Sequence, residues 1–270
     1  MKNIFTLFFL SFILFSCSRD DESTTISAEE YPLVTKLNVG FSNGYNSDNN
    51  FYFDYDSNNR LIKKKGGFLQ LSGGTGYNGF FTDKLFTSLV YTNNKVTVEN
   101  FSSSDEFNPL KDTKYYFLNN NNQIIQKEIP SVYNNHQDRK QSFSYSNNQL
   151  VEINTTFPNM PYYPPDDYIE TYLEKFYYDT KGNLTKSEYF EQRNGINKGI
   201  KIIRTFGDYD NSYNPFRRLY LLDEYFYRAI SKNNYRKYNE VKYNEFGQIT
   251  SNIEQTWTFN YDNSGNIIIN

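Results

Sequence analysis

The sequence predicts an all-β protein: one large, curled antiparallel β-meander of hairpin repeats, with one short helix near residues 214–230. Three observations predict this class. Aromatic residues make up 19% of the chain, and they favour strands and bury large areas. They alternate with polar residues, as in half-buried strands. Asn, Asp and Gly recur between the alternating segments, where tight hairpins need residues that tolerate a left-handed backbone.

The composition excludes several classes of protein. A mean hydropathy of -0.77 approaches that of a disordered chain, but disordered chains lack this many aromatic residues. The net charge of -3 gives no electrostatic footprint for nucleic acid, so we expect no nucleic-acid partner. One Cys and one His cannot build a Cys/His zinc site, a catalytic thiol–imidazole pair or an intrachain disulfide.

The N-terminus is predicted to be an export signal. Lys2 precedes an apolar run over residues 4–15, which is too short to span a bilayer as a mature helix. The run ends in Leu14-Phe15-Ser16-Cys17, which resembles the lipobox of bacterial lipoproteins. The resemblance implies that residues 1–16 are a lipoprotein signal peptide and that Cys17 carries the lipid that attaches the protein to the membrane. The alternative is an ordinary secretory signal with an incidental cysteine.

Residues 17–30 are polar and are predicted to form a flexible tether. About 14 such residues hold a domain some 20 Å from its anchor. The acidic run Asp20-Asp21-Glu22 resembles the signal that sends some Gram-negative lipoproteins to the outer face of the outer membrane. The resemblance implies an outer-membrane lipoprotein exposed at the cell surface, whereas the alternative is a merely solvated linker.

Residues 31–270 are predicted to form one β domain in which an aromatic strand, a turn and a second strand recur seven times. The seven segments are FDYDSNNRLIKK (53–64), LVYTNNKVTV (89–98), YFLNNNNQIIQK (116–127), FSYSNNQLVEI (143–153), YYDTKGNLTKS (177–187), VKYNEFGQITS (241–251) and FNYDNSGNIII (259–269). Their spacing is irregular, which favours a meander with insertions over a solenoid or propeller. About a dozen strands are expected, and sheets of that width usually curl or close.

Two of these segments, beginning Tyr178-Asp179-Thr180-Lys181-Gly182 and Tyr261-Asp262-Asn263-Ser264-Gly265, resemble the YD repeat of the RHS family. They resemble more closely a group of bacterial lipoproteins built from degenerate YD repeats. The resemblance implies an RHS/YD-like roll. RHS proteins repeat the unit many times around a toxin, whereas this chain has about seven degenerate units, so encapsulation is not expected.

One segment departs from the strand pattern. Asn214 is a good N-cap, and Pro215 follows it at the first helical position, where a missing N–H costs nothing. Apolar residues then recur at three- and four-residue steps: Phe216, Leu219, Tyr220, Phe226, Tyr227 and Ile230. We expect a single helix that covers an open edge or mouth of the sheet.

Motifs for cofactors and metals are incomplete. Gly74 to Gly79 match G-x-G-x-x-G, but their neighbours are hairpins and not a βαβ unit. Asp54 and Asp208 each begin a segment like a calcium loop, yet both segments lack the glycine and the final glutamate. We therefore expect no cofactor and no metal site.

No catalytic residue is predicted. The pairs Asp166/Asp167, Glu170/Glu174 and Asp223/Glu224 offer carboxylates of the kind that cleave glycosidic bonds, but closeness in sequence does not set the required separation. Glu170, Tyr172 and Glu174 would share one face of a strand. His136 lies in a polar turn and has no nucleophile elbow beside it.

A proline-rich segment is the candidate binding loop. Four prolines stiffen residues 157–168, and the aromatic residues that they would display are Phe157, Tyr162, Tyr163 and Tyr168. Such rings suit a glycan or a protein partner, although they would equally serve to cover an end of the sheet. We expect a non-catalytic binding or scaffold module; the alternative is a surface hydrolase that acts on glycan or peptide with paired carboxylates.

Overall fold

The computed structural model describes residues 33–38, 49–73, 76–105, 112–165, 167–263 and 268. All of them belong to one compact unit, Tyr31–Asn270. The predicted signal peptide, the tether and Cys17 lie outside the described residues. Within the described part, no helix is both long enough and apolar enough to cross a membrane.

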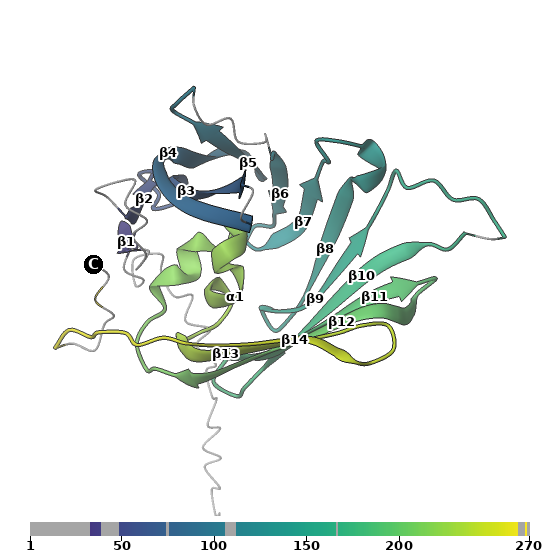
Figure 1. The fold of residues 1–270 in the computed structure, drawn as a ribbon. Helices are drawn as coiled ribbons and strands as arrows, with labels where there is room; N and C mark the ends of the chain where they lie inside the picture. The colour runs from purple at the N-terminus through teal and green to yellow at the C-terminus, as the bar shows by residue number, and fades with distance from the viewer. Residues whose placement is uncertain are drawn as a thin grey trace, which may run out of the picture. The chain divides into compact units, whose positions relative to one another are not determined.

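The described residues form one 14-stranded sheet in which every strand pairs antiparallel with its neighbours in sequence (Figure 1). The strands are β1 (Lys36–Asn38), β2 (Asn50–Tyr55), β3 (Leu61–Gly73), β4 (Gly76–Thr92), β5 (Lys95–Ser102), β6 (Lys114–Leu118), β7 (Ile124–Ile129), β8 (Arg139–Ser146), β9 (Gln149–Thr156), β10 (Glu170–Tyr178), β11 (Leu184–Arg193), β12 (Ile196–Tyr209), β13 (Tyr235–Tyr243) and β14 (Ile249–Thr256). Among these strands β1 and β14 are the two ends of the order and do not pair with each other, so the sheet is open. The predicted all-β antiparallel meander is confirmed.

Connections alternate between the two ends of the strands because consecutive strands run in opposite directions. At one end, β2–β3, β4–β5, β6–β7, β8–β9 and β10–β11 are joined by tight turns. The longer connections 103–113, 130–138 and 157–169 leave and rejoin the sheet at the other end, which we call the loop end. The longest connection, residues 210–234 between β12 and β13, leaves the tight-turn end, and the three longer connections at the loop end have the chain length needed to build a site.

Four of the turns share one hydrogen-bond pattern, in which an Asp or Asn side chain accepts from main-chain N–H groups two and four residues later. Asp179 Oδ1 accepts from Lys181 N at 2.9 Å and from Asn183 N at 2.8 Å, and Gly182 has φ of 88°. The pattern recurs at Asp56, Asn119 and Asn244. The first six predicted hairpins are confirmed; the seventh lies largely outside the described residues.

Replacing Gly182 is expected to strain this turn. A β-branched residue disfavours φ of 88°, while a Cβ there would meet nothing closer than Gln149 Nε2 at 3.4 Å. We expect Gly182→Val to lower the free energy of unfolding by about 1–2 kcal/mol through backbone strain. Thermal unfolding checks this, with Lys181→Val in the same turn as the control. Equal melting temperatures for Gly182→Val and the parent would contradict it.

Four tyrosine hydroxyls donate to main-chain carbonyls that lie 21 to 30 residues earlier in the chain. Tyr91 donates to the carbonyl of Leu61 at 3.1 Å, and Tyr145 donates to that of Ile124 at 2.9 Å. Burial raises the pKa of Tyr145 to about 12, so this donor stays protonated. The same contact joins Tyr55 to Val34 and Tyr209 to Leu184. The recurring aromatic residue before the turn therefore has a structural role.

Lysines lie directly opposite aromatic residues on neighbouring strands. Lys95 is opposite Phe117, and Lys186 is opposite Tyr177 with its Nζ 4.1 Å from the ring centroid. Lys201 is opposite Phe190, at 5.4 Å from its ring. Such pairs stabilise a sheet, and the lysine stem covers the ring while its charge stays in water. They explain how a chain of such low hydropathy carries so many aromatic residues.

The connection between β12 and β13, residues 210–234, forms an insert with three short helical segments: η2 (Pro215–Leu219), η3 (Asp223–Tyr225) and α1 (Phe226–Ala229). The predicted short helix is present, but the expectation of one continuous helix is wrong. Asn214 does cap the start, accepting from Phe216 N at 3.0 Å. Leu222 is extended, with φ of -98° and ψ of 121°, which interrupts the helix. Leu221 and Leu222, which lead into this break, are both buried.

The insert packs on a face of the sheet and not over an edge, which corrects the expected position. Asp223 contacts Lys127 of β7 at 2.5 Å, Tyr225 lies 5.9 Å from Phe53 of β2, and Tyr227 lies 5.7 Å from Phe206 of β12. In a flat sheet β2 and β12, ten strands apart, would be separated by about 48 Å. Five consecutive residues reach both, so the sheet curls around the insert (Figure 1).

Candidate binding site

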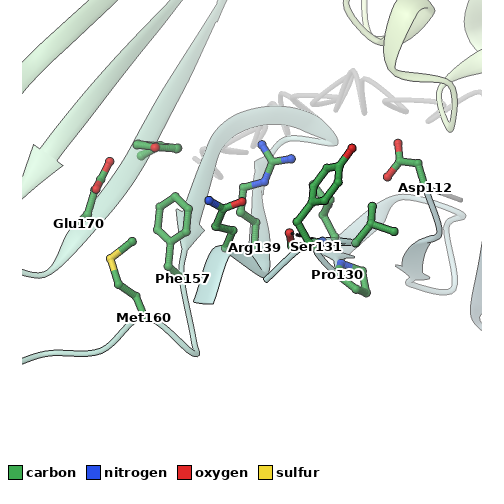
Figure 2. A pocket seen from close by; sticks show the side chains of 12 residues that line it. Asp112, Pro130, Ser131, Arg139, Phe157, Met160 and Glu170 are labelled. Atoms are coloured by element: carbon green, nitrogen blue, oxygen red, sulfur yellow. Dashed lines mark hydrogen bonds between the residues drawn. The ribbon is translucent and has the colours of Figure 1, made fainter. Parts of the chain in front are cut away.

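A pocket of about 440 Å³ opens at the loop end, on the same face of the sheet as the insert (Figure 2). Its lining residues are Asp112, Ile129, Pro130, Ser131, Val132, Tyr133, Gln137, Arg139, Phe157, Met160, Glu170 and Tyr172. They come from the connections β5–β6, β7–β8 and β9–β10 and from the adjoining strand ends. Three connections that are consecutive at this end of the meander thus meet around one cavity.

The β7–β8 connection is a loop that is held in shape by its own hydrogen bonds. Its one-turn 3₁₀ helix η1 (Asn135–Gln137) begins at Asn134, whose side chain accepts from His136 N at 2.9 Å. Ser131 Oγ accepts from the main chain of Tyr133 and Asn134, each at 3.4 Å. The loop positions the side chains of Tyr133 and Gln137 at the pocket.

Asp138 ties the two longest walls of the pocket together. One carboxylate oxygen accepts from Ser131 N at 2.7 Å, which closes the β7–β8 connection on itself. The other accepts from Asn159 Nδ2 at 2.8 Å, which reaches across to the proline-rich connection. Hydrogen bonds to a charged acceptor are stronger than neutral ones, so Asp138 holds both loops in one arrangement.

The apolar wall consists of rings on two neighbouring strand ends. Phe157 packs edge-on against Tyr172, with centroids 5.0 Å apart and an interplanar angle of 87°. Tyr172 in turn contacts Tyr189 at 5.5 Å. Burial raises the pKa of Tyr172, and its hydrogen bond to Glu170 raises it further. The phenol therefore stays neutral and keeps the Glu170 carboxylate in place.

Two carboxylates of the pocket have partners within the protein, whereas two of its donor side chains have no acceptor among the described residues. Asp112 pairs with Lys114 at 2.9 Å, and Glu170 accepts from Tyr172. No acceptor within the described residues takes a hydrogen bond from the Arg139 guanidinium or the Gln137 amide, and both residues are exposed at the pocket. Figure 2 places Asp112 and Glu170 at opposite ends of the pocket, with Arg139 between them.

The predicted loop residues occupy different positions. Phe157 folds back onto Tyr172 and lines the pocket, as does Met160. Tyr162 and Tyr163 follow directly and are 49% and 72% exposed, outside the pocket. Tyr168 is also exposed, and the Arg193 guanidinium lies 4.7 Å from its ring. The structure thus brings only Phe157 into the cavity and leaves two tyrosines in solvent beside it.

The β7–β8 side of the pocket is not predicted by the sequence motifs. The pattern of residues 134–139 indicates a polar turn around His136, which is exposed in η1 and does not line the cavity. The topology of the sheet could have predicted that this loop contributes to the pocket, because alternate connections of a meander lie at the same end of the sheet. Applied to the predicted strands, that rule groups 130–138 with the proline-rich loop.

Three carboxylates of the predicted acid pairs, those of Glu174, Asp223 and Glu224, hold the insert on the sheet. Glu174 accepts from Arg204 at 3.1 Å and from the Tyr227 hydroxyl at 2.8 Å. Asp223 pairs with Lys127 and Lys114, and these lysines hold its pKa at about 2 despite burial. Glu224 pairs with Lys64. Asp166 lies outside the described residues, so the Asp166/Asp167 pair is not placed.

The calcium-like segments use their carboxylates internally. Asp56 accepts from its own turn and pairs with Arg60 at 2.7 Å. Asp210 accepts from Asn234 and Ser212. Across the part of the chain that the structure describes, no group of three His, Cys, Asp or Glu is arranged to hold a metal. Of the G-x-G-x-x-G match, residues 76–79 lie in β4, which pairs antiparallel with β3, unlike a dinucleotide-binding unit.

A second pocket, also of about 440 Å³, lies where β11 and β12 approach the β13–β14 turn. Its lining includes Lys198, Gly199 and Glu191, and the Glu191 carboxylate accepts from Ile200 N at 3.1 Å. A Cβ on Gly199 would lie 2.7 Å from that carboxylate, so the glutamate already fills the space next to the bulged strand. The pocket at the proline-rich loop therefore remains the stronger candidate.

No family model and no curated protein matches the chain. Several solved structures are similar, among them two porin-like proteins. A porin-like protein from Bacteroides vulgatus ATCC 8482 is 11% identical, with a TM-score of 0.50 over 87% of this chain and 90% of that one. A porin-like protein from Bacteroides uniformis ATCC 8492 is 12% identical, with a TM-score of 0.49 over 88% of each chain. At this identity the Bacteroides vulgatus structure supports the fold alone.

Proposed function

We propose that this protein is an outer-membrane lipoprotein, exposed at the cell surface, whose β domain is a non-catalytic binding module. Its ligand site is the pocket between the β7–β8 and β9–β10 connections. One observation carries the proposal: Arg139 and Gln137 face the cavity with no internal acceptor among the described residues, beside the apolar surface of Phe157. A concave pocket in which a few polar groups lie beside an apolar wall is typical of a ligand site.

The membrane part of the proposal rests on the sequence around Cys17. The chain has one cysteine, and it stands where the lipobox needs it. The name of the Bacteroides vulgatus protein, porin-like, is compatible with an envelope location. The resemblance to YD-repeat lipoproteins is part of the same proposal, and the four turns of identical hydrogen-bond pattern support it.

The second candidate function is a surface hydrolase that acts on glycan or peptide. Asp112 and Glu170 line the same pocket, which is the observation in its favour. Both carboxylates are already bound, to Lys114 and to Tyr172, and they lie at opposite ends (Figure 2). A glycosidase needs two carboxyl groups on either side of one bond, so the arrangement favours binding over cleavage.

The exposed tyrosines provide the test. We expect a Tyr162→Ala/Tyr163→Ala variant of the full-length lipoprotein to melt like the parent, because both rings lie in solvent. It is expected to lose roughly 2 kcal/mol of affinity for the partner captured from native envelopes if these rings are hot-spot residues. Capture followed by mass spectrometry and a binding titration measure both effects.

Phe246→Ala is the matched control, since Phe246 is 78% exposed on the β13–β14 turn, away from the pocket residues. Unchanged capture by the tyrosine variant would exclude Tyr162 and Tyr163 from the interface. A captured glycan or peptide that is released in shortened form would favour the hydrolase instead.

A further inference from the structure

We infer that the pocket binds one uncharged pyranose unit of an oligosaccharide, and that Tyr162 and Tyr163 contact the units that follow. The inference rests on the proposed function and names the ligand class of its site. Four properties of the cavity carry it: the charge, the hydrogen-bonding groups, the apolar surface and the size.

The charges around the cavity balance. Asp112 is paired with Lys114 at 2.9 Å, and Glu170 and Arg139 contribute one charge of each sign to the lining. An acidic sugar, a phosphate or a peptide carboxylate therefore gains no net attraction from these groups. The ligand that fits is uncharged.

The hydrogen-bonding groups require a ligand that both donates and accepts. Arg139 and Gln137 offer N–H donors without an acceptor among the described residues, while the oxygens of Glu170 and Asp112 are held as acceptors by Tyr172 and Lys114. A hydroxyl group has one donor and two acceptor positions, so a ring with several hydroxyls satisfies both kinds at once. A purely apolar ligand would leave buried polar groups unpaired, at a cost in affinity.

The apolar wall suits the carbon face of such a ring. Phe157 is held edge-on to Tyr172, and Met160 lies beside it, as Figure 2 shows. The negative face of an aromatic ring attracts the weakly positive C–H groups of a sugar, and stacking of this kind needs no charge on the ligand. A pyranose has the required combination of one apolar face and a polar edge.

The size of the cavity points to a small unit and not to a protein surface. About 440 Å³ is in the lower part of the range for small-molecule sites, roughly 300–1,000 Å³. A protein partner needs about 800 Å² of contact on each side, far more than one such cavity provides. The chain runs from Met160 through Pro161 to Tyr162 and Tyr163, whose exposed rings are available to the sugar units that follow.

The experiment uses the full-length lipoprotein in detergent and immobilised hexasaccharides as probes. The neutral probes are linear hexamers of glucose, mannose and galactose, and the acidic probe is a hexamer of galacturonate. We expect at least one neutral hexamer to bind and the galacturonate hexamer not to bind. Phe157→Ala and Gln137→Ala are each expected to weaken binding at least tenfold, while Phe246→Ala leaves it unchanged. Gln137 is exposed, so its variant tests the site even if Phe157→Ala lowers stability.

The outcomes separate this inference from the proposed function. If no neutral hexamer binds, or if the galacturonate hexamer binds best, the ligand class is wrong. If the same pocket variants nevertheless fail to capture an envelope protein that the parent captures, the proposed binding function is retained and its partner is a protein. If neutral hexamers bind equally well to the parent and to both pocket variants, the site is elsewhere and both proposals are overturned at this pocket.

Discussion

We expect the Arg204→Ala variant to be about 3–5 kcal/mol less stable than the parent, which for a domain of this size lowers the melting temperature by roughly 10 °C. Arg204 lies on β12 beneath the insert, with its side chain 14% exposed. Its guanidinium donates to Glu240 at 2.8 Å and to Glu174 at 3.1 Å. Removing it leaves two carboxylates in a poorly hydrated site without the cation that compensates them.

The consequence reaches the insert because Glu174 also accepts from the Tyr227 hydroxyl at 2.8 Å. Burial raises the pKa of Tyr227, and the nearby Glu174 charge raises it further, so the phenol remains a donor to that carboxylate. Loss of Arg204 is therefore expected to loosen α1 as well as the sheet. Hydrogen exchange of the amides in residues 226–230 measures this loosening directly.

Two further variants test whether the loss of the Arg204 charge causes the expected drop in stability. Arg236→Ala, on the neighbouring strand, removes an exposed pair with Asp208 and is expected to change the melting temperature little. Adding Glu174→Gln to Arg204→Ala is expected to restore part of the lost stability, because a neutral amide costs less to bury than an unpaired carboxylate. If Arg204→Ala melts like Arg236→Ala, the buried network does not stabilise the fold.

Replacement of the predicted lipid anchor has the largest expected effect in the cell. Cys17→Ala is expected to abolish labelling by a fatty-acid analogue and to move the protein from the membrane to the soluble fraction. The physical reason is that acyl chains supply about 0.8 kcal/mol for each buried methylene, and the polar residues 17–30 offer no substitute. Fractionation followed by immunodetection measures the shift.

Ser16→Ala is the matched control, since it keeps a small residue before the cysteine and is expected to retain the lipid. The purified Cys17→Ala protein is expected to melt like the parent once the lipid is absent from both, because Cys17 precedes the domain that begins at Tyr31. Persistent membrane attachment of Cys17→Ala would overturn the lipoprotein assignment.

The two ends of the sheet have different roles, one in stabilising the fold and the other in the proposed ligand binding. Tight turns and tyrosine hydroxyls hold one end, where an Asp or Asn side chain takes the main-chain donors that the turn leaves open. At the loop end, Asp138 closes the β7–β8 connection through Ser131 N and joins it to the β9–β10 connection through Asn159. The tight-turn end supplies the rigidity, and the loop end is left to present side chains to a ligand.

The sequence by itself determined the hairpins and their order. Alternating aromatic residues with Asn, Asp or Gly between them are local signals, and each turn depends only on its own few residues, as at Asp179 and Gly182. The N-cap at Asn214 was readable for the same reason. The extent of the helix was not, because the apolar residues recur at helical spacing on both sides of Leu222, where the backbone is extended.

Only the tertiary structure decided where the insert lies and which residues form the pocket. The curl of the sheet brings Phe53 and Phe206 to the same insert, and no local signal encodes contacts between strands so far apart in the order. The pocket likewise brings together Asp112, Arg139 and Phe157 from three connections and their strand ends. The sequence gives the lengths of these connections, but it does not show how they lie relative to one another. Side-chain contacts across a curved sheet depend on its twist and packing, and these are properties of the whole fold.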